Sequence, residues 1–325
     1  MKKAVRTGSI LLVIVVGFLA FNNRQYIIDQ YEALVYKPPA SIVAIEQQVQ
    51  LTSDGQRIFY ATRPSVEDPS TFNQNCQRLE AGNPILGCYT TNDRIYIYNL
   101  TNEQLKGMEE VTAVHEMLHA VWQRTSDKDK TSLATSLQAA YAKIDDAQLK
   151  ERMAYYERTE PGEFANELHS ILGTEKASLG EPLESYYAKY FSRQQVLALH
   201  QQYNGVYEAL YKRADELYAL METLSRTIES ESASYQADMN QLEQDIARFN
   251  ARASAGEFSS GYQFSSERNA LIARSNKLET KRLSINNTIE QFNLYNEEYK
   301  KISDQIQVLN DSMDSLKQLD AAPKV

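Results

Sequence analysis

The chain has 325 residues, which is long for one domain and sufficient for two. Hydrophobic residues make up 42% of it, enough to build a buried core, and the small numbers of Gly and Pro argue against extended low-complexity linkers. The formal net charge of -9 excludes the basic surface that nucleic-acid binding requires, so we expect no nucleic-acid partner.

The N-terminal segment, residues 1–23, has the character of an export signal. Three basic residues precede an apolar run from Ile10 to Phe21. As a helix this run would span roughly 18 Å, short of a hydrocarbon core of about 30 Å, which favours a cleaved signal peptide. The bulky Phe18 two positions before Ala20 favours a retained membrane anchor instead, which we slightly prefer. Both alternatives place the bulk of the chain outside the cytoplasm, as a single-pass protein of the cell membrane or a secreted one.

The next segment, residues 24–40, is expected to be a linker or a short helix that ends at two prolines. From residue 41 to 100 the pattern is short and β-like. The segments RIFYATRP at residues 57–64 and DRIYIYNL at residues 93–100 are rich in β-branched and aromatic residues, and the turn signal SDGQ precedes the first. We therefore expect a strand in each segment.

The chain has two cysteines, Cys76 and Cys88, and the residues between them include Gly, Asn and Pro, which allow the chain to turn back. In an exported chain, two cysteines predict one disulfide bond. A pair of free buried thiols is the alternative.

From Thr101 to residue 193 the pattern becomes helical, although Gly107 can interrupt the first helix. After the helix that carries AVHEMLHAVW, residues 113–122, further helices are expected at residues 129–143, 146–156, 161–172 and 181–191. Short strands followed by helices predict a small α+β domain at residues 41–193.

The stretch AVHEMLHAVW places His115 and His119 one turn apart on one face of a helix, with Glu116 between them. This spacing suits two ligands of a tetrahedral Zn²⁺, and a glutamate beside the metal can act as a general base. The alternative is two histidines that share one side of a helix without a metal.

The segment VTAVHEMLHAVW resembles the active-site helix of zincin metallopeptidases. Metzincins continue with a glycine and a third histidine, where this chain has Trp122 and Thr125, so that branch is excluded. The resemblance is to gluzincins, which implies a third zinc ligand, a glutamate, on a later helix. Residues 159–173, TEPGEFANELHSILG, supply such a helix, with Pro161 in its first turn and Gly173 at its C-terminal end.

Two glutamates on that later helix compete for the role of ligand. NELHS, residues 166–170, resembles the N-E-x-x-S segment of thermolysin-like enzymes, which implies Glu167, but Ile171 replaces the aspartate expected four residues later. In an E-x-x-x-E pattern Glu163 would bind zinc and Glu167 would orient a histidine. We take Glu167 as the ligand and Glu163 as the runner-up. His169 lies about 200° around the helix from Glu167, so we expect it to form hydrogen bonds in the core or at the edge of the cleft.

In zincins a strand just upstream of the active-site helix binds the substrate as an added extended strand. The resemblance gives this role to Tyr96, Ile97 and Tyr98, and an ordinary sheet strand with both edges paired is the alternative. Hydroxyls that could stabilise a tetrahedral intermediate belong to Tyr155, Tyr156, Tyr186 and Tyr187, with packing as the alternative role of each.

From residue 194 to 320 apolar residues recur at spacings of three and four. Two such runs flank ARASAGEFSSGYQFSS, so we expect an antiparallel coiled-coil hairpin with its tip at about residues 250–265 and a short tail at 321–325. Each arm would reach roughly 80 Å. Two long helices folded back on the first domain are the alternative. The hairpin could bind a protein partner.

These features predict an α+β protein: a small zincin-like metallopeptidase domain, with a short β-sheet plus helices, followed by a long antiparallel α-helical coiled-coil hairpin. The resemblance implies a zinc metallopeptidase, and the N-terminal segment predicts that it is extracytoplasmic and membrane-tethered. It would hydrolyse peptide bonds of a peptide or protein substrate with a zinc-activated water, Glu116 as general base and Zn²⁺ on His115, His119 and Glu167. The alternative is a non-enzymatic coiled-coil adaptor of the cell envelope with a relic or structural zincin domain; hydrolysis of peptidoglycan or another amide is a third possibility.

Overall fold

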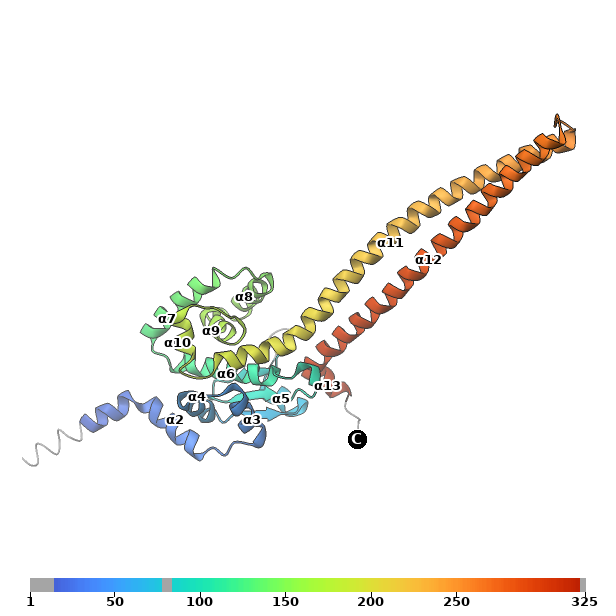
Figure 1. Cartoon of the computed structure of the whole chain (residues 1–325). Helices are drawn as coiled ribbons and strands as arrows, with labels where there is room; N and C mark the ends of the chain where they lie inside the picture. The colour runs from blue at the N-terminus through green and yellow to red at the C-terminus, as the bar shows by residue number, and fades with distance from the viewer. Residues whose placement is uncertain (1–14, 78–83, 322–325) are drawn as a thin grey trace, which may run out of the picture. The chain divides into compact units, whose positions relative to one another are not determined.

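The computed structural model describes residues 15–77 and 84–321 and divides the chain into two compact units. Unit 1 comprises residues 1–206 and 308–325, and unit 2 comprises residues 207–307. The chain is mostly helical with one small sheet (Figure 1). This agrees with the α+β class at that level of detail.

The N-terminal signal or anchor expected at residues 1–23 lies mostly outside the described residues, as does the tail from 322 to 325. Within the ranges that the structure describes, no helix combines the length and apolar character needed to cross a membrane.

The sheet of unit 1 has three strands, β1 (Ser65–Glu67), β2 (Gly87–Tyr89) and β3 (Ile95–Tyr98), in the order β1-β3-β2. β3 is parallel to β1 and antiparallel to β2. The strand expected in DRIYIYNL is therefore confirmed as β3, the central strand. Ile95 and Ile97 of β3 are fully buried and join the main core.

The prediction of a strand in RIFYATRP is wrong, because residues 57–61 of this segment belong to helix α4 (Ser53–Ala61). The SDGQ sequence starts the helix instead of making a turn: the Thr52 side chain accepts a hydrogen bond from the Gly55 N–H, and Asp54 lies in the first turn. Ile58 and Phe59 are buried in the main core. Tertiary burial thus outweighs the β propensity of these residues.

Two further helices precede α4, one in the segment that was expected to be a linker or a short helix and one in the region that was expected to be β-like. α2 spans Arg24–Val35 and α3 spans Ala40–Val49. α3 buries Ile42, Ile45 and Val49, a helical spacing of three and four. Pro39 precedes its first residue, where a missing N–H costs nothing.

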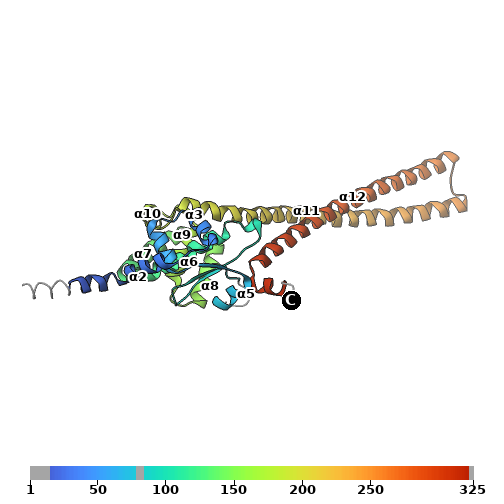
Figure 2. The same cartoon turned by 90° about the horizontal axis from the view of Figure 1, so that it is seen from below.

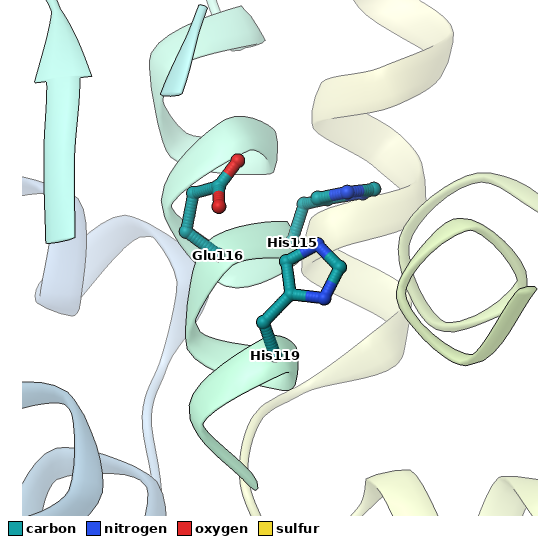
Figure 3. Close-up of side chains that lie close together, drawn as sticks. All are labelled: His115, Glu116 and His119. Carbon is teal, nitrogen blue, oxygen red and sulfur yellow. The ribbon is translucent and has the colours of Figure 1, made fainter. Parts of the chain in front are cut away.

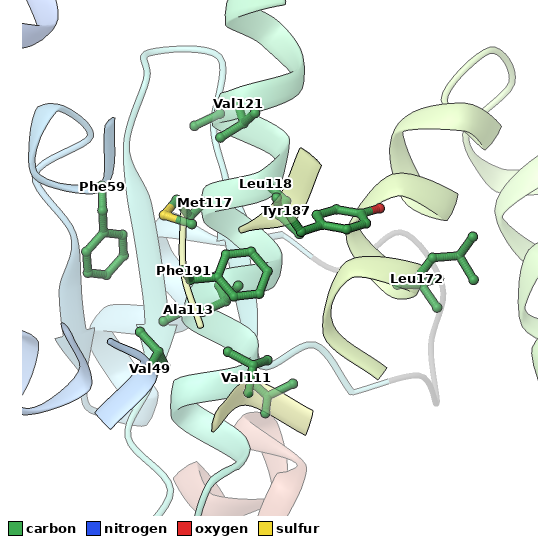
Figure 4. Packing of buried hydrophobic residues seen from close by; sticks show 14 of the residues in the cluster. Val49, Phe59, Val111, Ala113, Met117, Leu118, Val121, Leu172, Tyr187 and Phe191 are labelled. Atoms are coloured by element: carbon green, nitrogen blue, oxygen red, sulfur yellow. The ribbon is translucent and has the colours of Figure 1, made fainter. Parts of the chain in front are cut away.

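The centre of unit 1 is helix α6 (Met108–Arg124), which carries the two histidines. Gly107, at φ 98°, separates it from the short 3₁₀ helix η1 (Glu103–Leu105), as the sequence indicated. Figure 4 shows apolar side chains from several elements packed around α6. The fully or nearly fully buried residues of α6 include Ala113, Val114, Met117, Leu118, Ala120 and Val121.

The remaining helices of unit 1 are α5 (Pro69–Asn75), α7 (Asp127–Tyr141), α8 (Ala147–Thr159), α9 (Phe164–Glu175) and α10 (Glu181–Tyr187). The helices expected from the sequence after residue 125 are present with shifted ends. Gly173 was expected at the C-terminal end of this helix, but α9 continues for two more residues. A Cβ on Gly173 would lie 2.6 Å from Leu118 Cδ1 and 2.7 Å from Tyr187 Cε1, so this glycine permits close packing of α9 on its neighbours.

Cys76 and Cys88 form the expected disulfide, with their Cα atoms 5.9 Å apart. The bond links the C-terminal end of α5 to β2. α5 also contacts the last helix of the chain, α13 (Ser315–Ala321), where the Ser315 hydroxyl donates to Asn73 Oδ1 over 2.8 Å. The C-terminal residues are therefore part of unit 1.

Unit 2 is built from the two longest helices, α11 (Arg193–Ala255), which begins in unit 1, and α12 (Gly261–Met313), which ends there (Figures 1 and 2). Ion pairs show that they run antiparallel: Arg213 pairs with Glu298, and Asp245 pairs with Arg274. Apolar side chains between them are buried, among them Leu217, Leu242, Leu278 and Ile285. Gly256, at φ 66°, follows α11 where the chain turns back.

The close packing at Gly173 predicts opposite effects for two Gly→Ala changes. Gly173→Ala should lower the free energy of unfolding of unit 1 by about 1–3 kcal/mol, because the new methyl group overpacks the core. Gly205→Ala, in α11 with nothing within 4 Å of the added Cβ, should raise it by up to about 1 kcal/mol through helix propensity. Urea unfolding followed by the fluorescence of Trp122, the single tryptophan, measures both. Equal effects of the two changes would contradict the packing argument.

Candidate metal centre

Helix α6 brings His115, Glu116 and His119 together. One possible ligand atom from each lies within 4.8 Å of the others, so the three could hold a metal ion. The two imidazole rings are 4.9 Å apart at their centroids, and Figure 3 shows them on one side of the helix with Glu116 on the adjacent side. This follows from the helical repeat, which puts residues four apart on one face.

Glu167 of α9 reaches the same two histidines. Its Oε1 lies 3.5 Å from His119 Nε2, and its Oε2 lies 3.8 Å from His115 Nε2. The carboxylate is nearly buried, with a side-chain exposure of 7%. The structure thus places Glu167, of the two glutamates considered, beside the histidine pair.

Glu163, the other glutamate, reaches His119 only through Asn166. Its Oε2 accepts a 2.9 Å hydrogen bond from Asn166 Nδ2, and Asn166 Oδ1 lies 3.0 Å from His119 Nδ1. A carboxylate only accepts, so the Asn166 amide must turn its NH₂ to Glu163 and its oxygen to the ring. His119 Nδ1 then carries the proton, and its Nε2 presents a lone pair toward Glu167.

Ile171 stands where thermolysin-like enzymes have an aspartate. In the structure the orienting partners of His119 Nδ1 are Asn166 and, at 3.4 Å, the hydroxyl of Ser170. Both belong to the NELHS segment. The role of the missing aspartate is therefore filled by neighbours on the same helix.

Burial and mutual charge shift the pKa values of these groups. Burial raises the pKa of Glu116 above its ordinary value, although His119, His115 and the N–H of Tyr89 oppose the rise. Burial alone would lower the pKa of His115, but its hydrogen bond with Glu167 and the charges of Glu116 and Glu167 raise it overall. Burial alone would raise the pKa of Glu167, but His115 and His119 lower it overall. Glu167 is therefore held as a carboxylate, the form that binds a cation.

A cavity of about 1170 Å³ opens onto the three side chains of α6 and onto Glu167. β2 and the turn after it line one side, and α8 lines another with Arg152, Tyr155 and Tyr156. Of the four tyrosines considered, Tyr155 and Tyr156 line this cavity. Tyr187 is fully buried and its hydroxyl donates to the His169 carbonyl, and Tyr186 packs against the main core.

β3, with Tyr96, Ile97 and Tyr98, cannot bind a substrate as an added strand, because β1 and β2 pair with its two edges. This corrects the expectation and supports the alternative of an ordinary central strand. The edge strand beside the cavity is β2, whose Gly87, Cys88 and Tyr89 all line it. The sequence did not single out β2 because three residues are too few for a strand pattern.

One face of β2 lies close to α6 at Gly87. Leu86 O accepts from Tyr98 N–H, so by the antiparallel alternation the backbone groups of Gly87 and Tyr89 point away from β3. The Tyr89 N–H lies on the side of Glu116 and opposes the rise in the pKa of that carboxyl. A Cβ on Gly87 would lie 2.8 Å from Glu116 Cγ and 2.7 Å from Thr112 Cγ2, so only glycine fits here.

His169 does not form the ring hydrogen bonds expected from the sequence. It is fully buried, and neither ring nitrogen has a hydrogen-bond partner among the described residues. The ring stacks on Tyr187 and packs against Trp122, with centroid distances of 5.5 and 5.4 Å. Burial lowers its pKa to about 3, so the ring is neutral. His169 is not among the residues that line the cavity.

Arg152 and Glu175 form a second polar pair close to the centre that the sequence did not reveal. Arg152 Nη2 of α8 donates to Glu175 Oε2 at the end of α9, and His200 Nε2 of α11 lies 3.9 Å from the same oxygen. The charge of Arg152 also contributes to lowering the pKa of Glu167. No local motif marks these residues, which lie far apart in the sequence.

The geometry predicts different losses of zinc binding for the two glutamates of α9. Glu167→Ala and His115→Ala should each abolish stoichiometric binding of Zn²⁺, because each removes a group that faces the site. Glu163→Ala should weaken affinity by roughly 10- to 100-fold, since it acts through Asn166 and His119. Metal analysis after dialysis and competition with a chromogenic chelator measure both. A greater loss for Glu163→Ala than for Glu167→Ala would reverse the assignment.

Comparisons of this chain with protein-family models, curated proteins and solved structures found no match. The structure therefore shows a His-Glu-x-x-His cluster that could hold a metal ion, without showing a zincin fold. Any function rests on the geometry of the site itself.

Proposed function

We propose that this protein is an extracytoplasmic, membrane-tethered zinc metallopeptidase. The observation that carries the proposal is the approach of Glu167, from a separate helix, to the Nε2 atoms of both histidines, at 3.5 and 3.8 Å. Glu116, next to His115 in sequence, faces the cavity from the other side and is not needed as a ligand. A purely structural metal site would not require this additional buried carboxylate.

The donor set suits Zn²⁺. Two imidazoles and one carboxylate are the ligands of many catalytic zinc sites, which leave a fourth position open. Ligand atoms at the corners of a tetrahedron around Zn²⁺ are about 3.4 Å apart, close to the two distances from Glu167. With Glu167 as the third ligand, Glu116 is left to act as a base.

When bound, Zn²⁺ would polarise the scissile carbonyl and lower the pKa of a water molecule. The Glu116 carboxylate would take the proton of that water and then donate it to the leaving amine. Burial raises the pKa of Glu116, which suits a group that must hold a proton between the two steps. Asn166 and Ser170 would keep His119 in the tautomer that leaves Nε2 free.

The substrate in this proposal is an extended peptide along β2. Gly87 directs its N–H and C=O away from β3, so they are available for main-chain hydrogen bonds of the kind used in strand addition. Tyr155 and Tyr156 on the opposite wall offer hydroxyls for the carbonyl oxygen. An extracytoplasmic location is supported by the Cys76–Cys88 bond, since disulfides persist in oxidising compartments.

A coiled-coil adaptor of the cell envelope is the second candidate. It is favoured by the aromatic side chains that unit 2 exposes, Tyr218 on α11 and Tyr262 at the start of α12, which is 85% exposed. In that role the metal centre would be a relic or would only stabilise unit 1.

The first test replaces the base. Glu116→Gln should lower the rate of peptide cleavage by at least about 100-fold while zinc content and thermal stability stay close to those of the parent, because only the proton acceptor is lost. Glu151→Gln is the matched control: it removes an exposed carboxylate that lines the same cavity and should cleave like the parent. Cleavage of a mixed synthetic peptide library, read by mass spectrometry, gives the rates.

Two outcomes would refute the peptidase. One is a Glu116→Gln variant that cleaves as fast as the parent. The other is a zinc-loaded parent that cleaves no member of the library and a Glu116→Gln variant that supports every cellular role, which would leave the adaptor.

A second test addresses β2. Gly87→Ala should reduce kcat/KM by about 10-fold or more and leave zinc affinity unchanged, because a Cβ 2.8 Å from Glu116 Cγ must displace either the base or the edge strand. Thr91→Ala, an exposed change at the rim of the same cavity, is the control and should behave like the parent. Full activity of Gly87→Ala would show that the reaction does not require β2 to lie this close to Glu116.

A further inference from the structure

Helix α2 turns its polar side toward the rest of unit 1. Asp29 is only 2% exposed, and its carboxylate takes a bidentate pair of hydrogen bonds from Arg124, 2.9 Å from Nε to Oδ2 and 2.8 Å from Nη2 to Oδ1. Arg57 of α4 adds a contact at 3.5 Å, and Glu32, one turn after Asp29, pairs with Arg63. Ionic contacts therefore hold α2 against α4, α6 and the residues just after α4.

The opposite side of α2 is an exposed apolar stripe. Its members lie within about 120° of the helix circumference. They are 45–81% exposed and comprise Ile27, Ile28, Tyr31, Leu34 and Val35. A helix on the surface of a soluble domain has the reverse arrangement, with its apolar side inward and its charges in water. α2 is thus inverted: its apolar side faces outward and its charged side faces the protein.

The stripe continues an apolar segment. The residues just before α2 are helical from 15 to 22, and their large apolar side chains are 46–65% exposed: Val15, Val16, Phe18, Leu19 and Phe21. In the sequence, no charged residue occurs between Thr7 and Asn23. A continuous exposed apolar surface of this kind indicates a contact with an apolar medium or partner.

We propose that the apolar stripe of α2 lies in the surface of a lipid bilayer, parallel to the membrane plane. A lipid is favoured over a protein because the stripe follows directly on the uncharged apolar run and includes a tyrosine, Tyr31, which suits the interface between headgroups and acyl chains. An interfacial helix need not be long enough to span the bilayer. The inference does not depend on the zinc chemistry.

The contact would orient the metal centre with respect to the membrane. Arg124 occupies the last turn of α6, five residues after His119, and also binds Asp93 in the turn between β2 and β3. One buried guanidinium therefore ties the lipid-facing helix to both the helix of the metal centre and the strand at its cavity. Binding of α2 to the bilayer fixes the direction in which the cavity opens.

Site-directed spin labelling of the full chain in liposomes tests the proposal. Cys76 and Cys88 are bonded to each other and the chain has no other cysteine, so one introduced cysteine can be labelled alone. Leu34→Cys places a nitroxide at the most exposed member of the stripe, and Tyr31→Cys is a second site one turn earlier. Glu157→Cys, exposed on α8, is the control. Liposomes of phosphatidylcholine and phosphatidylglycerol supply the lipid.

Labels at positions 34 and 31 should collide more with oxygen than with a water-soluble nickel chelate, at a depth of about 5–10 Å below the headgroup boundary. The label at position 157 should show the reverse preference. Labels at 34 and 31 that collide with the chelate as often as the control would overturn the proposal. Labels at both stripe positions that are shielded from both reagents would overturn it too, since a protein partner or a second copy would then cover the stripe.

Discussion

The burial of α6 is the constraint on which the arrangement of unit 1 depends. One side of this helix carries Met117 and Leu118 into the core, and the other carries His115 and His119 to the cavity. Because residues of both kinds alternate along one helix, the packing of the apolar side fixes the direction of the imidazoles. The close approach of α9 at Gly173 then brings Glu167 within reach of both rings.

The cavity owes its electrostatics to the same packing. Three titratable side chains, His115, Glu116 and Glu167, are largely buried at one end of the cavity, where water screens them less than at the surface, so each shifts the pKa of the others. The polar chain from Glu163 through Asn166 to His119 sets the ring tautomer from outside. A metal cation would supply the counter-charge of the Glu167 carboxylate, so the proposed zinc site is compatible with the short distances from Glu167 to both Nε2 atoms.

Unit 1 is held together at its edges by polar and covalent links rather than by apolar packing alone. Arg124 joins α2, α6 and the β2–β3 turn through two carboxylates, and the Cys76–Cys88 bond joins α5 to β2. Both links end at the short sheet beside the cavity. A three-stranded sheet with strands of three or four residues has few hydrogen bonds of its own, so these links help to keep β2 next to Glu116.

The sequence by itself determined the helix with His115, Glu116 and His119, the disulfide, the presence of strand β3 and the two long helices, because each has a signal in neighbouring residues or in a regular repeat. It misassigned residues 57–64 and Gly173, where burial against distant residues outweighs local propensity. Only the tertiary structure decided that Glu167 and not Glu163 lies beside the histidines, that β2 is the edge strand, and that α2 is inverted. Each of these depends on which elements pack together, and single-sequence patterns do not encode that.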